Sequence, residues 1–210
     1  MKVSVYKNKG ASVSRFSKID YDQWDNHSRE ACLVFFNQYG WKVNNNDGKG
    51  SILFNPCDTD LRVTSPSGIT FYVECETKKS GFEKKYLEKG IHYTWRKINS
   101  ILGNKKRDPE NTIFITVNAN ADELVMVYGV YLKLAFDIWP EYAGYNQIQG
   151  TKNFVLPEHN CYPLYKATSR GSKPEHFVTI DWDRCSYYTK KDNVWTRVKK
   201  SDNKFMTKKT

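Results

Sequence analysis

Residues 58–79 read DTDLRVTSPSGITFYVECETKK and carry the clearest secondary-structure signals of the chain. The runs 61–64 and 69–77 are rich in β-branched and aromatic residues, which favour strands. The Ser-Pro-Ser-Gly segment at 65–68 separates them and is typical of a turn. The stretch therefore predicts a β-hairpin.

Carboxylates from both strands of this hairpin are expected at one edge. Asp60 stands at the start of the first strand, and the turn position sets it nearly opposite Val73 and Glu74. Side chains alternate along a strand, so Glu74, Glu76 and Lys78 share one face. Three acidic groups and one lysine therefore converge.

Such a cluster is a candidate cation site. Like charges at close range need a cation or a proton between them. Carboxylate oxygens suit Mg²⁺, which takes one or two of them together with water and phosphate oxygens, and Mn²⁺ is expected to substitute. The other interpretation is that Glu74, Glu76 and Lys78 form the solvated face of an antiparallel strand.

The flanking segments predict an α/β fold with a central mixed sheet. A helix is expected from Asp25 or Asn26 to Gly40, and a second from 81 to 102 with a break at Gly90. Further strand-like or extended runs lie at 41–43, 51–54, 111–118, 124–136 and 176–182. We expect an N-terminal arm at 1–25, one domain at 26–183 and a basic C-terminal extension at 184–210.

The net charge of +10 is concentrated in two blocks. Residues 78–107 carry +8 and residues 184–210 carry +7. Both blocks contain aromatic residues: Tyr86, Tyr93 and Trp95 in the first, Tyr187, Tyr188 and Trp195 in the second. Cations attract phosphates and rings stack on bases, so the expected partner is nucleic acid, most simply DNA. The candidate contacts are Lys79, Lys84, Lys85, Arg96 and Lys97.

Several other classes of protein lack support in the sequence. The five cysteines are dispersed and odd in number, which disfavours a disulfide framework or a zinc site. Phosphate-loop, dinucleotide-binding and serine-hydrolase motifs are absent. Neither a membrane-spanning run nor a secretory signal is evident, so we expect no membrane and an intracellular protein, cytoplasmic or nucleoid-associated.

The element order and the acidic motif resemble the PD-(D/E)xK nuclease superfamily, which includes many restriction enzymes, resolvases and repair exonucleases. The resemblance covers about residues 26–130. It implies a restriction-endonuclease-like αβββαβ core whose sheet is flanked by helices, and Mg²⁺-dependent hydrolysis of DNA by a metal-activated water. It also implies that Asp60 and an acidic residue of the motif bind the ion, with Glu30 on the first helix as a possible helper.

The motif can be placed in two ways. Transferred residue by residue, its acidic-x-Lys run falls on Glu76-Thr77-Lys78. The hairpin register instead brings Glu74 closest to Asp60, which makes the run Glu74-Cys75-Glu76, a Glu variant that occurs in the superfamily. The helper lysine is then Lys78, or Lys85 or Lys97 on the following helix.

The leading hypothesis is a Mg²⁺-dependent nuclease, and substitution of Asp60 or Glu74 is its first test. A second hypothesis is a protein that binds DNA or RNA without cutting it. A third is an interaction module whose basic tail meets an acidic protein. A homodimer is one arrangement in which both strands of a duplex are cut.

Overall fold

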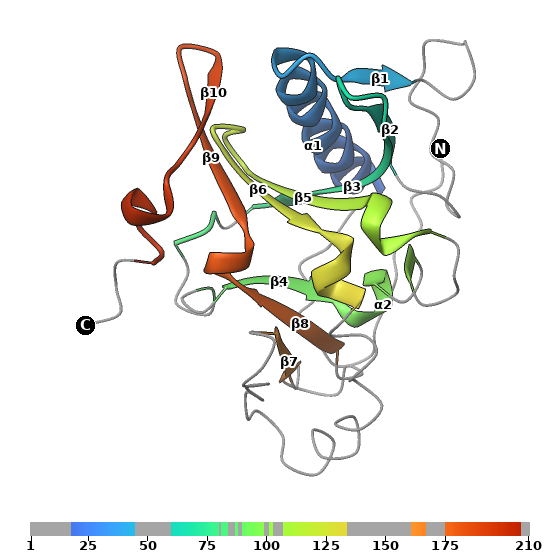
Figure 1. Ribbon diagram of the computed structural model, residues 1–210. Coiled ribbons are helices and arrows are strands. Elements are labelled where there is room, and N and C mark those ends of the chain that lie inside the picture. Colours follow the sequence, from blue (N-terminus) through green and yellow to red (C-terminus); the bar gives the residue numbers. More distant parts are fainter. Residues whose placement is uncertain are drawn as a thin grey trace.

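A seven-stranded sheet forms the centre of the fold (Figure 1). In spatial order its strands are β1 (Lys42–Asn44), β2 (Leu61–Thr64), β3 (Thr70–Lys78), β5 (Thr112–Asn118), β6 (Glu123–Tyr128), β9 (Ser186–Lys191) and β10 (Val194–Arg197). Neighbouring strands are antiparallel except β3 and β5, which run parallel. The structure, a computed structural model, describes residues 18–44, 60–79, 81–83, 87, 90–98, 101–102, 107–133, 161–166 and 175–206.

A helix and a smaller sheet lie on opposite sides of this central sheet (Figure 1). The helix is α1 (Lys18–Gln38), and the smaller sheet has the order β4 (Gly90–Thr94), β8 (Glu175–Asp181), β7 (Cys161–Lys166). Short helices with described bounds are α2 (Trp95–Ile98) and the 3₁₀ turns η3 (Pro109–Asn111), η4 (Trp182–Arg184) and η5 (Lys200–Asp202), and residues 129–133 are also helical rather than extended as the sequence predicts. Within the described ranges the protein is mixed α/β, with a mixed sheet and few helices.

The predicted hairpin is confirmed as strands β2 and β3. Leu61 pairs with Val73 and Thr64 pairs with Thr70, so the register is the one expected from the turn position. Gly68 in the turn has a φ of +85°, a conformation that favours glycine. Asp60 directly precedes Leu61, and this register brings it to the end of the strand pair beside Glu74.

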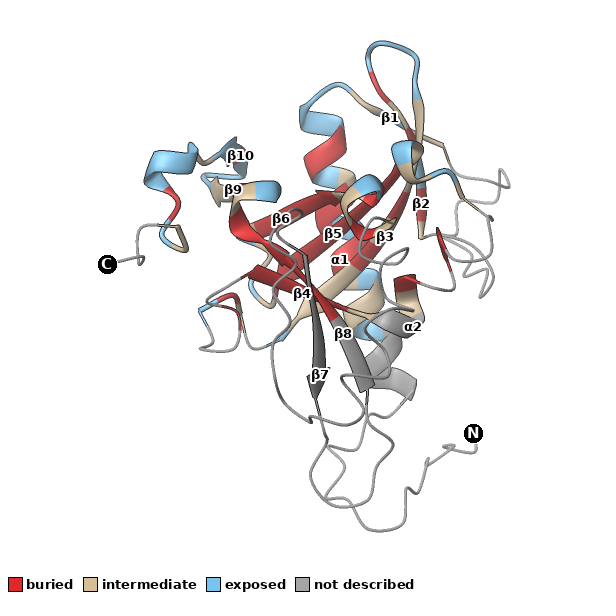
Figure 2. Cartoon of the chain, turned by 60° about the horizontal axis from the view of Figure 1, so that its bottom comes forward, coloured by how far each residue is buried: buried red, intermediate tan, exposed pale blue. Residues whose placement is uncertain are grey.

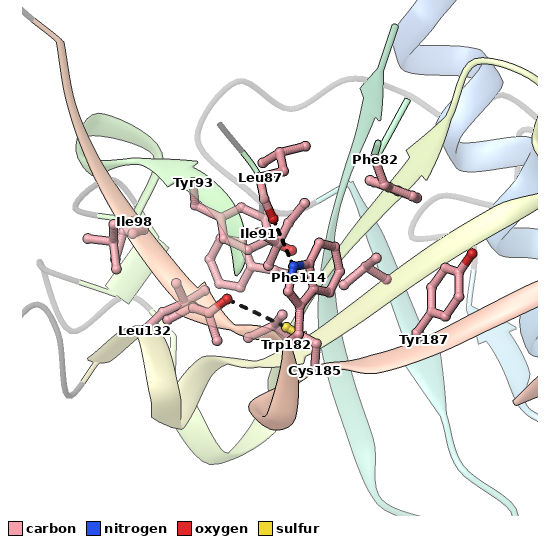
Figure 3. Packing of buried hydrophobic residues seen from close by; sticks show 14 of the residues in the cluster. Phe82, Leu87, Ile91, Tyr93, Ile98, Phe114, Leu132, Trp182, Cys185 and Tyr187 are labelled. Atoms are coloured by element: carbon pink, nitrogen blue, oxygen red, sulfur yellow. Dashed lines mark hydrogen bonds between the residues drawn. The ribbon is translucent and has the colours of Figure 1, made fainter. Parts of the chain in front are cut away.

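Alternation of side chains gives the central sheet two apolar faces. Phe36 of α1 and Val73 of β3 are buried together on one face. Phe114 of β5 is buried on the other face with Trp182, whose indole N–H donates to the backbone oxygen of Leu87 over 2.8 Å (Figure 3). Burying each large apolar side chain contributes about 1.5–3 kcal/mol, and the buried central strands in Figure 2 reflect this double packing.

Helix α1 begins earlier than expected. It starts at Lys18, whereas the sequence predicts a start at Asp25 or Asn26, so part of the expected N-terminal arm is helical. The hydroxyl of Thr77 donates to the backbone oxygen of Trp24 over 2.8 Å. This contact with the end of β3 therefore stabilises the first turns of α1. Because it is a tertiary contact, the local capping signals in the sequence do not indicate the earlier start.

The prediction of a helix across residues 81–102 is wrong for its central part. Gly90–Thr94 form strand β4, paired with β8, and helix α2 begins after it at Trp95 and is described to Ile98. A Cβ atom built on Gly90 would lie 2.0 Å from the backbone oxygen of Ile180. Gly90 thus permits close approach of two strands rather than breaking a helix.

The expected C-terminal extension supplies two strands of the central sheet, β9 and β10. Tyr187, Tyr188 and Trp195 are only 3%, 7% and 1% exposed, and Tyr93 is 1% exposed. These four rings belong to the apolar core and do not present faces for stacking on bases, which corrects the sequence-based expectation for them.

Some expectations fall outside the described residues. They concern the run 51–54, Asp58, Lys84, Lys85 and Tyr86, together with the side chains of Trp95 and Arg96.

None of the described helices has the length and apolar character needed to cross a membrane.

The substitution Gly90→Ala tests the assignment of β4 by the sign of its effect. In a helix the change would stabilise the protein by about 1 kcal/mol. Against the Ile180 backbone it should instead lower the free energy of unfolding by about 1–3 kcal/mol. Denaturant titration measures this change, and a stabilised variant would contradict the strand assignment.

Candidate active site

Three carboxylates and two cations gather beside the first strands of the central sheet. Asp60 precedes β2, while Glu74 and Glu76 lie on β3. Arg29 reaches this region from α1 and Lys97 reaches it from α2. Four segments of the chain therefore build one charged cluster.

Both carboxylate oxygens of Asp60 accept hydrogen bonds. Oδ1 accepts from the guanidinium of Arg29 over 2.7 Å, and Oδ2 accepts from the backbone N–H of Cys75 over 2.7 Å. Arg29 also lies 2.7 Å from the carboxylate of Asp25, one turn earlier in α1. The side chains of Arg29 and Asp60 are only 3% and 9% exposed. The buried ion pair of Asp60 with Arg29 thus joins the helix to the hairpin.

Lys97 bridges the two glutamates of β3. Its ammonium lies 3.0 Å from Glu74 Oε1 and 3.4 Å from Glu76 Oε2, and it donates to the backbone oxygen of Cys75 over 3.4 Å. Glu76 Oε1 accepts from the hydroxyl of Thr116 on β5 over 3.1 Å. The Lys97, Glu74 and Glu76 side chains keep 22%, 14% and 25% exposure, so solvent reaches this half of the cluster.

Burial is the main influence on the pKa of Glu74, and the neighbouring charges modify it. Burial raises the pKa of Glu74 to about 7, the carboxylates of Asp60 and Glu76 add to the rise, and Lys97 opposes it. Burial lowers the pKa of Lys97, but the charges of Glu74, Glu76 and Asp60 outweigh it and raise that pKa above its ordinary value. Lys97 therefore stays an ammonium.

The donor chemistry of the cluster suits a hard divalent cation, although its present arrangement is closed by protein cations. Asp60 and Glu74 offer carboxylate oxygens, of which Mg²⁺ needs only one or two. Among the described residues, no group of three or more His, Cys, Asp or Glu side chains is arranged to hold a metal ion. A bound cation would have to take the place of the Lys97 ammonium beside Glu74.

The structure brings together most, but not all, of the site residues expected from the sequence. Glu74 and Glu76 both contact Lys97, and the Cys75 backbone links this group to Asp60, because its N–H donates to Asp60 and its oxygen accepts from Lys97. Lys78 lies at the end of β3, in register with Asn118 of β5. Glu30 is exposed on α1, and Arg29 is the helix residue that reaches Asp60, so Glu30 does not contact this network.

Arg29 is the site residue that sequence reasoning missed. It lies three residues before Cys32 and seven before Phe36, which places it on the buried stripe of α1. A cation on a buried stripe requires a carboxylate partner. The position of Arg29 on that stripe was therefore a usable signal for its pairing with Asp60.

Cations and aromatic rings adjoin the cluster. The guanidinium of Arg107 lies 4.2 Å from the ring centre of Tyr72, and that of Arg62 lies 5.8 Å from it. Tyr72 is two residues before Glu74 and therefore projects to the same side of β3. The ammonium of Lys79 lies 4.7 Å from the ring centre of Trp24, at the other end of β3. Positive side chains thus lie before and after the acidic positions of this strand.

No family model, no curated protein and no solved structure matches this chain. What the cluster does is therefore inferred from its own geometry and charge.

Asp60→Ala should destabilise the fold because it leaves the Arg29 guanidinium buried without its main partner. We expect a loss of about 3–5 kcal/mol in the free energy of unfolding, measured by urea titration. Replacing Arg29 by Met in the Asp60→Ala background should restore part of that loss. Equal stability of Asp60→Ala and the unsubstituted protein would show that the pair does not hold the helix to the hairpin.

The charges around Glu74 predict opposite effects of two substitutions on its pKa in the metal-free protein. Lys97→Met removes the ammonium that lowers the pKa of Glu74, so the value should rise above about 7. Asp60→Asn removes a like charge, so the value should fall. Carbon-detected NMR titration measures the carboxyl group directly, and shifts of the same sign in both variants would contradict this electrostatic description.

The same pKa predicts how stability depends on pH. The folded state holds the Glu74 proton more tightly than the unfolded state, where the ordinary value is 4.5. Between about pH 4.5 and 7 the folded state therefore binds more protons, and this group's contribution to stability falls as the pH rises. Chemical denaturation at several pH values should show this fall reduced in Glu74→Gln.

Proposed function

We propose that the protein is a Mg²⁺-dependent nuclease that hydrolyses phosphodiester bonds of DNA, with its active site at Asp60, Glu74, Glu76 and Lys97. The observation that carries this proposal is the convergence of three carboxylates and the partly exposed ammonium of Lys97 at the end of the β2–β3 strand pair. Carboxylates that hold a cation, beside a lysine that faces a phosphate, are the side chains that phosphodiester hydrolysis uses.

The element order around the site supports a restriction-endonuclease-like core as part of this proposal. Helix α1 precedes the antiparallel strands β1, β2 and β3. Strand β4 of the smaller sheet and α2 come next, and then β5, which runs parallel to β3. The acidic residues come from the start of β2 and from β3, which are the places that the resemblance requires.

Asp60 and Glu74 are the residues that would hold Mg²⁺, with Glu76 as a further ligand or a water-positioning carboxylate. When bound, the ion supplies a Lewis acid that polarises the phosphate and lowers the pKa of a water molecule. Arg29 and the Cys75 N–H fix the orientation of the Asp60 carboxylate, so little conformational entropy remains to be lost at that ligand.

Lys97 is the helper lysine in this proposal rather than Lys78. Its raised pKa keeps it protonated, so it acts as a charge and not as a base. An ammonium near the two glutamates can stabilise negative charge that develops on the phosphate oxygens. Arg62 and Arg107 lie on the Tyr72 side of the strand, where they can contact neighbouring phosphates of the substrate.

A second candidate is nucleic-acid binding without catalysis. The favouring observation is that Arg29 and Lys97 already pair with the acidic side chains, so the cluster is closed without an added ion. In this case the carboxylates orient basic residues and do not act on the substrate. The two candidates differ in their response to Mg²⁺.

Glu74→Gln tests the proposal most cleanly because it removes the charge but keeps the shape and does not disturb the Arg29 pair. We expect cleavage of plasmid and single-stranded DNA in Mg²⁺, its loss in EDTA, and a fall of at least about a hundredfold in the variant. Gel analysis of the products gives the rates.

Glu110→Gln is the matched control, since Glu110 is exposed in η3 and the same charge is removed. It should cleave as the unsubstituted protein does, and all three proteins should bind DNA in EDTA. DNA binding without Mg²⁺-dependent cleavage in the unsubstituted protein would favour the second candidate. Full cleavage by Glu74→Gln would overturn the assignment of the site.

A further inference from the structure

A second charged feature lies three strand positions from the acidic cluster in the central sheet, where the chain leaves β10. A pocket of about 310 Å³ is lined there by Ser186, Tyr187, Arg197, Lys199, Lys200 and Asn203, among others. This volume is at the lower end of the range of about 300–1,000 Å³ that small-molecule and cofactor sites occupy. Three of these residues are cationic and exposed, at the end of the molecule where β9 and β10 lie in Figure 2.

The fold builds the walls of this pocket. The backbone N–H of Val198 donates to the oxygen of Tyr187 over 2.9 Å, which holds the chain after β10 against β9. The chain then turns through η5 and returns to the core, where Phe205 stacks on Trp182 with 4.3 Å between ring centres. Asn203 is 3% exposed and accepts from the Phe205 N–H over 3.0 Å. The pocket is therefore a property of packed elements.

The cations of the pocket are not neutralised by acidic side chains. Within the described part of the chain, Arg197, Lys199 and Lys200 form no ion pair, and Arg197 only donates to the hydroxyl of Ser186 over 3.2 Å. Lys204 behaves differently, because it lies 2.7 Å from both Glu83 and Glu123. Three cations around one concave surface create a positive potential that attracts an anion.

The pocket lies at the same level along the strands as the acidic cluster. Cys75 of β3 is in register with Ile115, Ile115 with Met126, and Met126 with Ser186 of β9. That line crosses three strand spacings, or roughly 14 Å at about 4.8 Å each. The sheet between the two sites is covered on both faces, so a nucleic-acid strand that contacts both would pass around the covering elements and span more than this distance. Phosphates of one duplex strand rise about 3.4 Å each, so several nucleotides would be needed.

We propose that this pocket binds a phosphate group of the nucleic-acid strand on which the acidic cluster acts. The guanidinium of Arg197 offers paired N–H donors that match phosphate oxygens, and Lys199 and Lys200 act as point charges. The choice of a nucleic-acid phosphate as the ligand rests on the proposed function. The pocket then positions the substrate and carries out no chemistry.

The test measures DNA affinity in EDTA, so that no cleavage is needed. Fluorescence anisotropy of labelled single-stranded and duplex oligonucleotides is compared between the unsubstituted protein, Lys199→Gln/Lys200→Gln and Lys42→Gln/Lys191→Gln. The last pair removes the same charge from exposed lysines that do not line the pocket. We expect the pocket pair to weaken binding about tenfold near 0.1 M salt and to lower the slope of log affinity against log salt by about two.

Equal weakening by both pairs of substitutions, or no DNA affinity at all, would overturn the pocket proposal. Mg²⁺-dependent cleavage together with equal weakening would leave the nuclease proposal standing and remove only the pocket. Selective weakening by the pocket pair in a protein that never cleaves DNA would support the pocket and remove the nuclease. The two proposals can therefore fail separately.

Discussion

A buried ion pair between Arg29 and Asp60 is the constraint on which the arrangement of the site depends. It ties the first helix to the hairpin and fixes both oxygens of Asp60, one on the guanidinium and one on the Cys75 N–H. Two charges buried this deeply are favourable only when each is well paired. The cost of removing them from water is offset by these close contacts, which hold the start of β2 beside Glu74.

A single lysine, Lys97, pairs with the two glutamates of the cluster. Lys97 contacts both glutamates, yet the pKa of Glu74 is still raised to about 7, because burial and two neighbouring carboxylates outweigh one ammonium. Under the proposed function, a bound cation or a substrate that draws Lys97 away would relieve this repulsion. Other phosphates of the bound nucleic-acid strand would then contact Arg62, Arg107 and the pocket at Arg197.

The sequence predicted those parts of the fold that local signals determine. The hairpin followed from its Ser-Pro-Ser-Gly turn and alternating pattern, and with it came the nearness of Asp60 to Glu74. Strand β4 was missed because its pairing depends on Ile180, ninety residues after Gly90. Tyr187 and Trp195 were misassigned to a nucleic-acid surface because composition does not show which face a ring occupies, and β9 and β10 bury both rings in the core.

The proposed nuclease activity requires that the acidic cluster accept a divalent cation in place of the Lys97 charge. Anomalous scattering from crystals grown with Mn²⁺ and a non-cleavable oligonucleotide measures this most directly. We expect one Mn²⁺ ion coordinated by the carboxylates of Asp60 and Glu74, with the ammonium of Lys97 moved from Glu74 toward a phosphate. Lys97 still bridging Glu74 and Glu76, with no manganese signal beside them, would contradict it.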